Sequence, residues 1–108
     1  MKLQLISQGF ALTPALRRHL ERRLAFALGR FGHEVSQVWA RVADTNGPKG
    51  GVDKLVAVRV QGRRLQTILV SDTDANLYAA IDRAADRVGR AIARALDRHQ
   101  QRRYLRPD

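Results

Sequence analysis

The chain contains no cysteine, few aromatic residues and no long apolar run. Without cysteine, neither a disulfide framework nor a thiolate metal site can form, which fits the reducing cytoplasm. No apolar stretch is long enough to span a bilayer. The N-terminal residues Met1 to Leu5 lack the apolar run of a signal peptide. The sequence therefore predicts a cytoplasmic protein that does not bind a membrane.

Lysine is also scarce, whereas arginine is abundant. Of the twenty Lys and Arg residues only Lys2, Lys49 and Lys54 are lysine, and ten Asp and Glu oppose them. The net charge is +10 and the pI is about 11.5. Such an excess favours a polyanionic partner, with nucleic acid ahead of anionic lipid. A merely solubilising surface has the same composition, so charge alone leaves both interpretations open.

Apolar periodicity and turn residues divide the chain into six elements. A helix begins at the N-cap Thr13 and Pro14, because both residues favour a helix start, and Gly32 is its expected stop. A last helix, capped by Asp72, Asp74 or Asn76, runs to about residue 102. Four strands are expected at residues 2–7, 35–43, 54–60 and 65–71, the last two joined by a tight turn at 61–63.

This order predicts an α+β fold, β-α-β-β-β-α, with two helices packed on one face of a four-stranded mixed sheet. The first two strands are expected to be parallel neighbours, and the others antiparallel. The chain length fits one domain at residues 1–100, followed by a basic tail at 101–108 that we expect to be disordered. The turn-rich segment 44–51 is expected to be a mobile hairpin loop.

Signals for enzymatic chemistry are weak. The three histidines His19, His33 and His99 are scattered and have no metal-ligand spacing. The glycine-rich segment 47–51 lacks the frame of a phosphate-binding loop and does not lead into a helix. We therefore predict no catalytic residue, no metal, no cofactor and no small-molecule substrate.

The last helix carries arginine at steps of three and four residues, which are the steps of one helix face. At about 100° per residue, these arginines fall within an arc of roughly 80°. The apolar stripe of the same helix lies roughly 130° away, and the acidic residues Asp82, Asp86 and Asp97 lie on the far flank. Pairing remains available, for instance between Asp86 and Arg90. The stripe indicates an anion-binding face, although a solvated surface remains the alternative. Its members are Arg83, Arg87, Arg90, Arg94 and Arg98.

The first helix adds basic residues on the side opposite its apolar stripe of Leu16, Leu20, Leu24, Ala27 and Phe31. Two helices packed side by side would merge their basic faces into one surface. Phe26 lies among these cations, where it stacks on a base, packs under the neighbouring helix or is simply exposed. The cations are Arg18, Arg22 and Arg30 on the outer side, and Arg17 and Arg23 at the borders.

Alternation in the second strand places Val38, Ala40 and Val42 toward the helices and Trp39 on the open side of the sheet, with Ile6 of the first strand. Two interpretations of Trp39 remain. It is part of a protein-contact or dimer patch, or its ring is covered by an arginine such as Arg41 or Arg59.

Three segments resemble the ribosome hibernation-promoting factor family, which includes the ribosome-associated inhibitor A proteins. They are LTPALRRHLERRL at 12–24, the three central strands and LYAAIDRAADRVGRAIARAL at 77–96. The most specific pieces are T-P-A-L-R at 13–17 and Y-x-A-I-D at 78–82. The chain departs from the family's usual residues at Phe26, Gly29 and Asn76.

The resemblance implies a β-α-β-β-β-α fold that binds the small ribosomal subunit and its ribosomal RNA in the decoding region. There it stops translation and stabilises inactive ribosomes in stress or stationary phase. The resemblance implies a short form that ends at Asp108, without the second, dimerising domain of long members. Tyr78 and Ile81 match the family motif, where we interpret them as packing residues. The family's basic positions fall on Arg87, Arg90, Arg94 and Arg98 in the last helix and on Arg17, Arg22 and Arg23 in the first.

We therefore expect a non-enzymatic translation inhibitor that acts as a monomer or weak homodimer. Two alternatives use the same basic face: a regulatory module that binds an acidic protein, and a generic nucleic-acid-binding module. The sequence does not decide whether the protein pairs ribosomes or only blocks single ones, nor which stress induces it.

Overall fold

The elements follow one another in the predicted order in a computed structural model, which describes residues 2–9, 11–44 and 54–105, with side chains up to residue 98. The expected hairpin loop falls almost entirely on residues 45–53, outside the described residues. One short 3-10 turn, η1, was not predicted. The elements are β1 (Lys2–Gln8), α1 (Pro14–Leu28), η1 (Gly29–Phe31), β2 (Val35–Asp44), β3 (Lys54–Gly62), β4 (Ile68–Asp74) and α2 (Leu77–Leu105).

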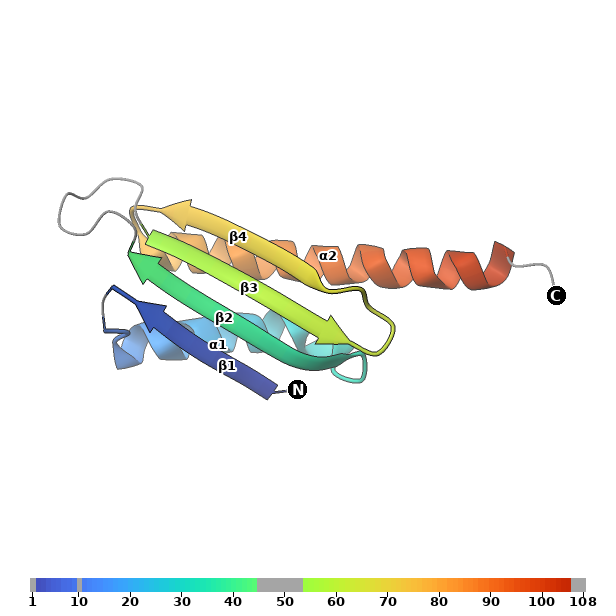
Figure 1. Ribbon diagram of the computed structural model, residues 1–108, viewed down its shortest axis with the longest axis horizontal. Coiled ribbons are helices and arrows are strands. Elements are labelled where there is room, and N and C mark those ends of the chain that lie inside the picture. The colour runs from blue at the N-terminus through green and yellow to red at the C-terminus, as the bar shows by residue number, and fades with distance from the viewer. Residues whose placement is uncertain (1, 10, 45–53, 106–108) are drawn as a thin grey trace.

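The four strands form one mixed sheet in the order β1-β2-β3-β4 (Figure 1). β1 pairs with β2 in parallel, because α1 carries the chain back between them, and the other two pairs are antiparallel. This confirms the predicted topology. In β2 and β3 the register places Val38 opposite Val60 and Ala40 opposite Val58. All four side chains are buried, so the middle of one sheet face is a continuous apolar surface.

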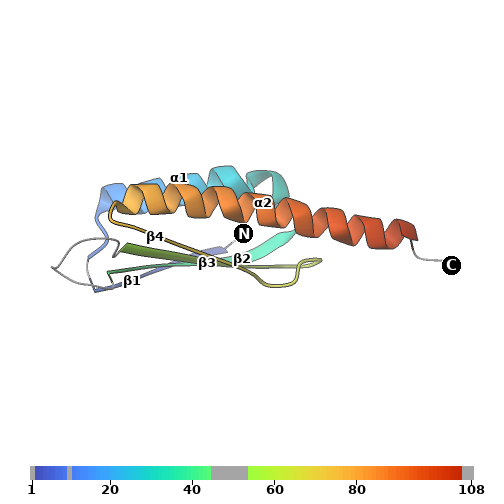
Figure 2. The same cartoon turned by 90° about the horizontal axis from the view of Figure 1, so that it is seen from above.

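Both helices lie on that apolar face, and none of the described residues forms a helix on the other face of the sheet (Figure 2). α2 packs against β3, β4 and α1. Full burial of an aliphatic side chain contributes about 1.5–3 kcal/mol, so the helices are held mainly by their apolar stripes. The fully buried large side chains of the two helices are Leu20, Leu24, Leu28, Ile81, Val88 and Ile92.

Alternation within the strands is also as predicted. Ile6 is 48% exposed and Trp39 is partly exposed, whereas Val38 and Ala40 are buried toward the helices. The guanidinium of Arg59 lies over the Trp39 ring, 4.0 Å from its centroid. The arginine cover that the sequence offered as one interpretation of Trp39 is therefore present.

Both helix starts use side-chain caps. The Oγ1 atom of Thr13 accepts a hydrogen bond from the backbone N–H of Leu16 at 3.2 Å, and Pro14 occupies the first helical turn. At α2, the Oδ1 atom of Asn76 accepts from the backbone N–H of Tyr78 at 3.0 Å. Asn76 is thus the cap among the three candidates, and these bonds satisfy donors that a helix start leaves free.

Several element ends differ from the predictions. α1 ends at Leu28 and tightens into η1, instead of continuing to Gly32. β4 spans Ile68–Asp74 instead of 65–71. β3 extends through Gly62, because the chain stays close to β2 after the strand. There the backbone N–H of Arg63 donates to the carbonyl of Glu34 at 3.1 Å.

α2 is longer than predicted and projects beyond the sheet (Figures 1 and 2). It continues to Leu105, because no glycine or proline lies between Gly89 and Pro107 to end it. The first part of the predicted tail, 101–105, is therefore helical, and residues 106–108 lie outside the described residues. Within the described chain, no helix is both long and apolar enough to cross a membrane.

Gly62 lets β3 approach the segment before β2 closely. A larger residue at this position should therefore destabilise the fold. A methyl group at Gly62 would overlap the backbone carbonyl of Glu34, whereas one at Gly29 would meet no atom. We expect Gly62→Ala to lower the free energy of unfolding by about 1–3 kcal/mol, the range for overpacking.

Gly29→Ala is the matched control, because Gly29 has helical backbone angles that alanine adopts without strain. Alanine also lowers the conformational entropy of the unfolded chain, which favours the folded state. It should leave the free energy of unfolding unchanged or raise it slightly. Urea denaturation followed by circular dichroism measures both variants, and equal midpoints would contradict the assigned contact.

Candidate nucleic-acid interface

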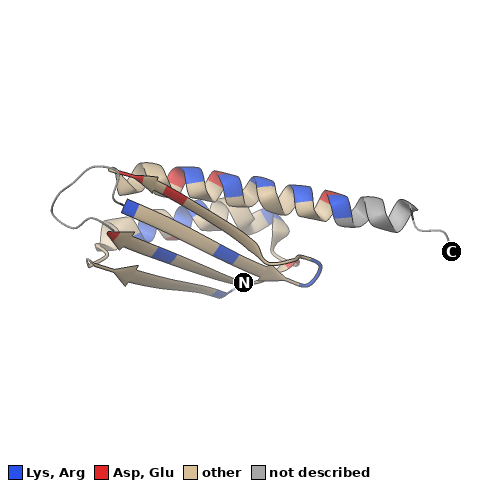
Figure 3. Cartoon of the chain, turned by 45° about the horizontal axis from the view of Figure 1, so that its top comes forward, with Lys and Arg blue, Asp and Glu red and all other residues tan. Residues whose placement is uncertain are grey.

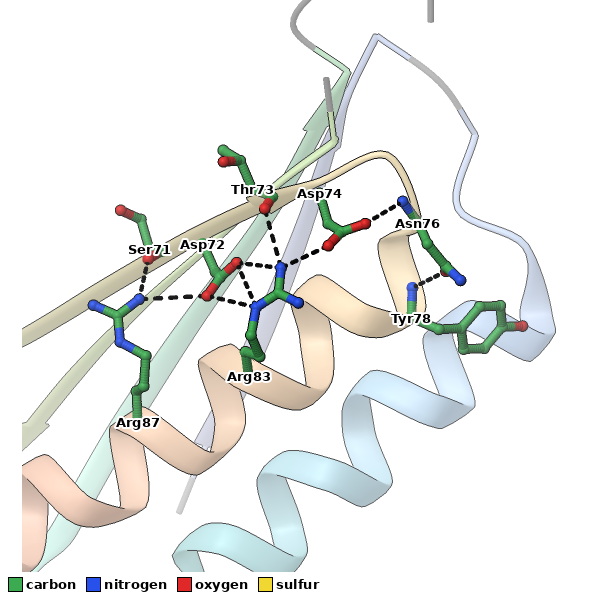
Figure 4. A network of polar contacts seen from close by, with 8 residues as sticks. All are labelled: Ser71, Asp72, Thr73, Asp74, Asn76, Tyr78, Arg83 and Arg87. Carbon is green, nitrogen blue, oxygen red and sulfur yellow. Dashed lines mark hydrogen bonds and ion pairs between the residues drawn. The ribbon is translucent and has the colours of Figure 1, made fainter. Parts of the chain in front are cut away.

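The predicted arginine stripe of α2 divides into two groups with different partners. Arg83, in the first group, donates to the carboxylate of Asp72 at 2.8 and 3.1 Å. It also donates to Asp74 Oδ2 at 2.8 Å and to the backbone carbonyl of Thr73 at 3.1 Å (Figure 4). All these acceptors belong to β4, so Arg83 ties α2 to the edge of the sheet.

Arg87, one turn further, makes a similar link. Its Nη1 atom donates to the backbone carbonyl of Ser71 at 2.6 Å and lies 3.5 Å from Asp72 Oδ2 (Figure 4). β4 carries its acidic residues only at its C-terminal end, beside the first turns of α2. Among the described residues, the stripe therefore has carboxylate partners near its start and none further along the helix.

The contacts of Arg83 alter the titration of both β4 carboxylates. The hydrogen bond from Arg83 is the main cause that lowers the pKa of Asp72 below its ordinary value of 3.8. For Asp74, the backbone N–H of Asn76 is the main cause of a lowered pKa, and Arg83 is the next. Both carboxylates are therefore ionised at neutral pH, and the network between β4 and α2 is fully formed there.

A second polar group fills the seam between the two helices. Arg23 of α1 donates to Asp82 at 3.1 Å and to Asp86 at 2.8 Å, both on α2. The ring of His19 lies beside them, with Nε2 2.7 Å from Asp82 Oδ1 and its centroid 4.9 Å from that of Tyr78. The acidic flank of α2 therefore faces α1, and Asp86 pairs with Arg23 instead of Arg90.

The helices approach each other closely at this seam because Gly89 is buried where α2 crosses α1. A methyl group at Gly89 would lie 3.4 Å from the carbonyl oxygen of Ala27 and 3.6 Å from its Cβ. Both distances are ordinary van der Waals contacts, so the two helices pack directly against each other at Gly89. The outer sides of α1 and α2 consequently form one continuous surface.

Most remaining cations of the two helices are exposed on that surface, which we call the helix face. Figure 3 shows basic positions recurring along α2 and on α1. Two members have weak neighbours: Arg17 lies 4.0 Å from Glu21, and Arg30 lies over the Phe31 ring at 4.6 Å. The others have no ion-pair partner among the described residues. The helix face comprises Arg17, Arg18, Arg22, Arg30, Arg90, Arg94 and Arg98.

Phe26 lies on the helix face and is 82% exposed. Of the interpretations that the sequence left open, packing under α2 is thereby wrong. Its position in α1, four residues from both Arg22 and Arg30, leaves a flat apolar ring among cations. Stacking on a base therefore remains a hypothesis for Phe26, beside simple exposure.

The helix face presents exposed guanidinium groups on two packed helices, and a guanidinium group can bind two phosphate oxygens at once. Within residues 2–9, 11–44 and 54–98, no group of three or more His, Asp or Glu side chains is arranged to hold a metal ion. Such an arrangement of exposed arginines can bind a polyanion through its backbone charge.

Comparison with protein families decides the affiliation. A family model described as sigma 54 modulation protein / S30EA ribosomal protein matches residues 3–100. The chain belongs to this family. The resemblance predicted from the two helical motifs is therefore confirmed, and the S30EA affiliation makes this a ribosome-associated modulation protein.

Solved structures agree with the S30EA fold. A ribosomal subunit interface protein from Coxiella burnetii has a TM-score of 0.72 and 21% identity, covering 87% of this chain and 96% of that one. The N-terminal domain of Thermus thermophilus Protein Y has a TM-score of 0.72 and 26% identity, covering 87% and 98%. None of the curated proteins matches the chain.

The paired arginines give a pH-dependent prediction. Arg83→Gln removes the donor that lowers the pKa of Asp72, so we expect it to reduce the free energy of unfolding at neutral pH. A lowered folded-state pKa contributes stability that is present above the unfolded value of 3.8 and is lost as pH falls through the folded value. The difference between wild type and variant should therefore shrink in acid.

Arg94→Gln is the control, because it removes the same charge from an exposed arginine without a partner among the described residues. The test compares the urea midpoints of Arg83→Gln and Arg94→Gln with those of the wild type. The midpoints are measured from neutral pH down to below the ordinary pKa of aspartate. If the two variants gave equal differences from wild type at every pH, the β4–α2 network would have no energetic role.

Proposed function

We propose that this S30EA-family protein inhibits translation by occupying the decoding region of the small ribosomal subunit through its helix face, and so stabilises inactive ribosomes in stress or stationary phase. The observation that carries the proposal is the row of exposed arginines on two adjacent helices. The family's ribosome association and the similarity to the ribosomal subunit interface protein from Coxiella burnetii support a ribosomal partner. The cell compartment is then the cytoplasm.

The proposal assigns different roles to the predicted site residues. Arg90, Arg94 and Arg98, with the exposed arginines of α1, contact phosphates of ribosomal RNA directly. Arg83, Arg87 and Arg23 act by fixing α2 against β4 and α1, since their guanidinium groups already bind carboxylates and carbonyls. If these arginines turned to a phosphate, the loss of their bonds within the protein would offset part of the gain in binding free energy.

The mechanism is occupancy without chemistry. Phosphate contacts release condensed counterions, so affinity arises largely from charge and falls with salt. A folded domain seated in the decoding region excludes messenger RNA and transfer RNA sterically, and the ribosome is left chemically unchanged. A regulatory module for an acidic protein remains the competing function, and ribosome binding separates the two.

Charge reversal tests the helix face. We expect Arg90→Glu with Arg94→Glu to weaken binding to purified small subunits by more than about tenfold, because two phosphate contacts become repulsive. The milder pair Arg90→Gln with Arg94→Gln should lower the slope of log affinity against log salt by about 2. Co-sedimentation over a salt series measures both quantities.

The matched control is Arg63→Glu with Arg64→Glu, two exposed arginines in the connection between β3 and β4. It changes the net charge equally but lies off the helix face. Binding lost equally in both glutamate variants would mean that net charge, and not this surface, holds the protein on the subunit. If both glutamate variants bound small subunits as tightly as the wild type, the proposal would be wrong.

Occupancy also predicts stoichiometric inhibition. In a cell-free translation reaction, inhibition should saturate near one protein per ribosome and should reverse when the protein is removed. Messenger RNA and initiator transfer RNA in excess should compete with it. Inactivation of many ribosomes by one molecule, or a covalent change in the RNA, would exclude this mechanism.

A further inference from the structure

The face of the sheet opposite the helices is open, and its side chains suit a different contact from those of the helix face (Figure 2). Residues from all four strands line a shallow hollow of about 420 Å³ in its middle. That volume lies within the usual range for small-ligand sites, roughly 300–1,000 Å³. Ile6 and Leu69 border the hollow and are 48% and 72% exposed.

The hollow contains a stacked pair of flat groups. The guanidinium of Arg59 lies 4.0 Å from the centroid of the Trp39 ring, and the two residues are register partners on β3 and β2. Arg59 is exposed on its outer side, so the pair presents a flat cationic plane to solvent. Both aromatic rings and guanidinium planes stack on unpaired bases.

The charge of the open face is of one sign. Lys2, Arg41 and Arg59 occupy positions that alternate with the buried ones, and no acidic side chain does so among the described strand residues. The acidic residues of the sheet lie on the other side, as Asp72 and Asp74 do when they bind Arg83 on α2. Figure 3 shows the basic positions in the middle of β2 and β3 and the acidic ones toward the strand ends.

Amide side chains complete the face. Gln4, Gln8, Gln37 and Gln61 alternate with buried positions and provide both donors and acceptors. Arg41 donates to Gln8 Oε1 at 2.8 Å, so one cation is already held in place beside the hollow. A second copy of this chain fits poorly here, because it would oppose like charges on a protein of net charge +10.

We propose that the open sheet face is a second RNA-binding surface, which takes an unpaired base on the Arg59–Trp39 plane and a neighbouring phosphate on Arg41. It lies on the opposite side of the sheet from the helix face. One protein would then contact two RNA segments at once. The inference does not depend on where on the ribosome the helix face binds.

Tryptophan fluorescence provides a direct test, because Trp39 is the only tryptophan in the chain. A short oligouridylate, which has unpaired and flexible bases, is titrated into the free protein. We expect saturable quenching of Trp39 emission. Arg59→Gln should weaken the apparent affinity from this signal by about tenfold, within the range for loss of one stacked base.

Arg64→Gln is the matched control, since it removes one charge from an exposed arginine in the connection between β3 and β4, outside both the helix face and the open sheet face. It should leave the quenching curve nearly unchanged. Arg41→Gln is a second variant on the open face and should also weaken the signal, so the test holds even if Arg59→Gln unfolds. Circular dichroism confirms that each variant is folded.

Three outcomes would overturn the proposal. The first is no change in Trp39 emission at any oligouridylate concentration. The second is equal quenching by oligoglutamate, which would indicate a site for acidic protein. The third is emission that changes with protein concentration alone, together with a dimer in sedimentation. Because no ribosome is present, none of these outcomes bears on the helix face, whose failure would appear only in subunit binding.

Discussion

The apolar face of the sheet is the constraint on which the rest of the molecule depends. Its central rows are valine and alanine from β2 and β3, and they are removed from water only when both helices lie on the same side. The crossover through α1 between parallel β1 and β2 brings α1 to that side, and α2 follows the last strand onto it. Every charged side chain that the structure describes on the helices is thereby directed to the seam, to the edge of β4 or to solvent.

That placement divides a single residue type between two purposes. Arg23, Arg83 and Arg87 bind carboxylates or carbonyls of neighbouring elements and hold the helices at fixed positions. Arg90 and Arg94 have the same helical phase as Arg83 but no acceptor nearby within the described chain. A rigid support for exposed cations lowers the conformational entropy lost on binding, which is the advantage of preorganisation. Under the proposed function, the high arginine content therefore serves the fold and the RNA interface together.

Sequence reasoning recovered the parts of the structure that depend on local pattern. The element order, the parallel β1–β2 pair, the Thr13 cap and the strand faces all follow from periodicity and turn chemistry, and each is present. Periodicity gives the direction of Arg83 on its helix, but not what lies under it. The carboxylates of Asp72 and Asp74 come from another element, so their pairing with Arg83 follows only from the tertiary fold. The end of β3 was missed for the same reason, because Gly62 lies against the backbone carbonyl of Glu34, and the N–H of Arg63 donates to that carbonyl.

The contacts of Arg83 and Arg87 with backbone carbonyls have a consequence for solubility. β4 is the last strand of the sheet, and such a strand offers free backbone groups to any other extended chain. The carbonyls of Ser71 and Thr73 are instead bonded by the two guanidinium groups. A foreign strand would have to displace both arginines, and it would bring its N–H donors against fixed positive charge. Arg83 and Arg87 of α2 therefore block this edge against strand pairing. Two sheets are then less prone to join edge to edge and to start a fibrous aggregate.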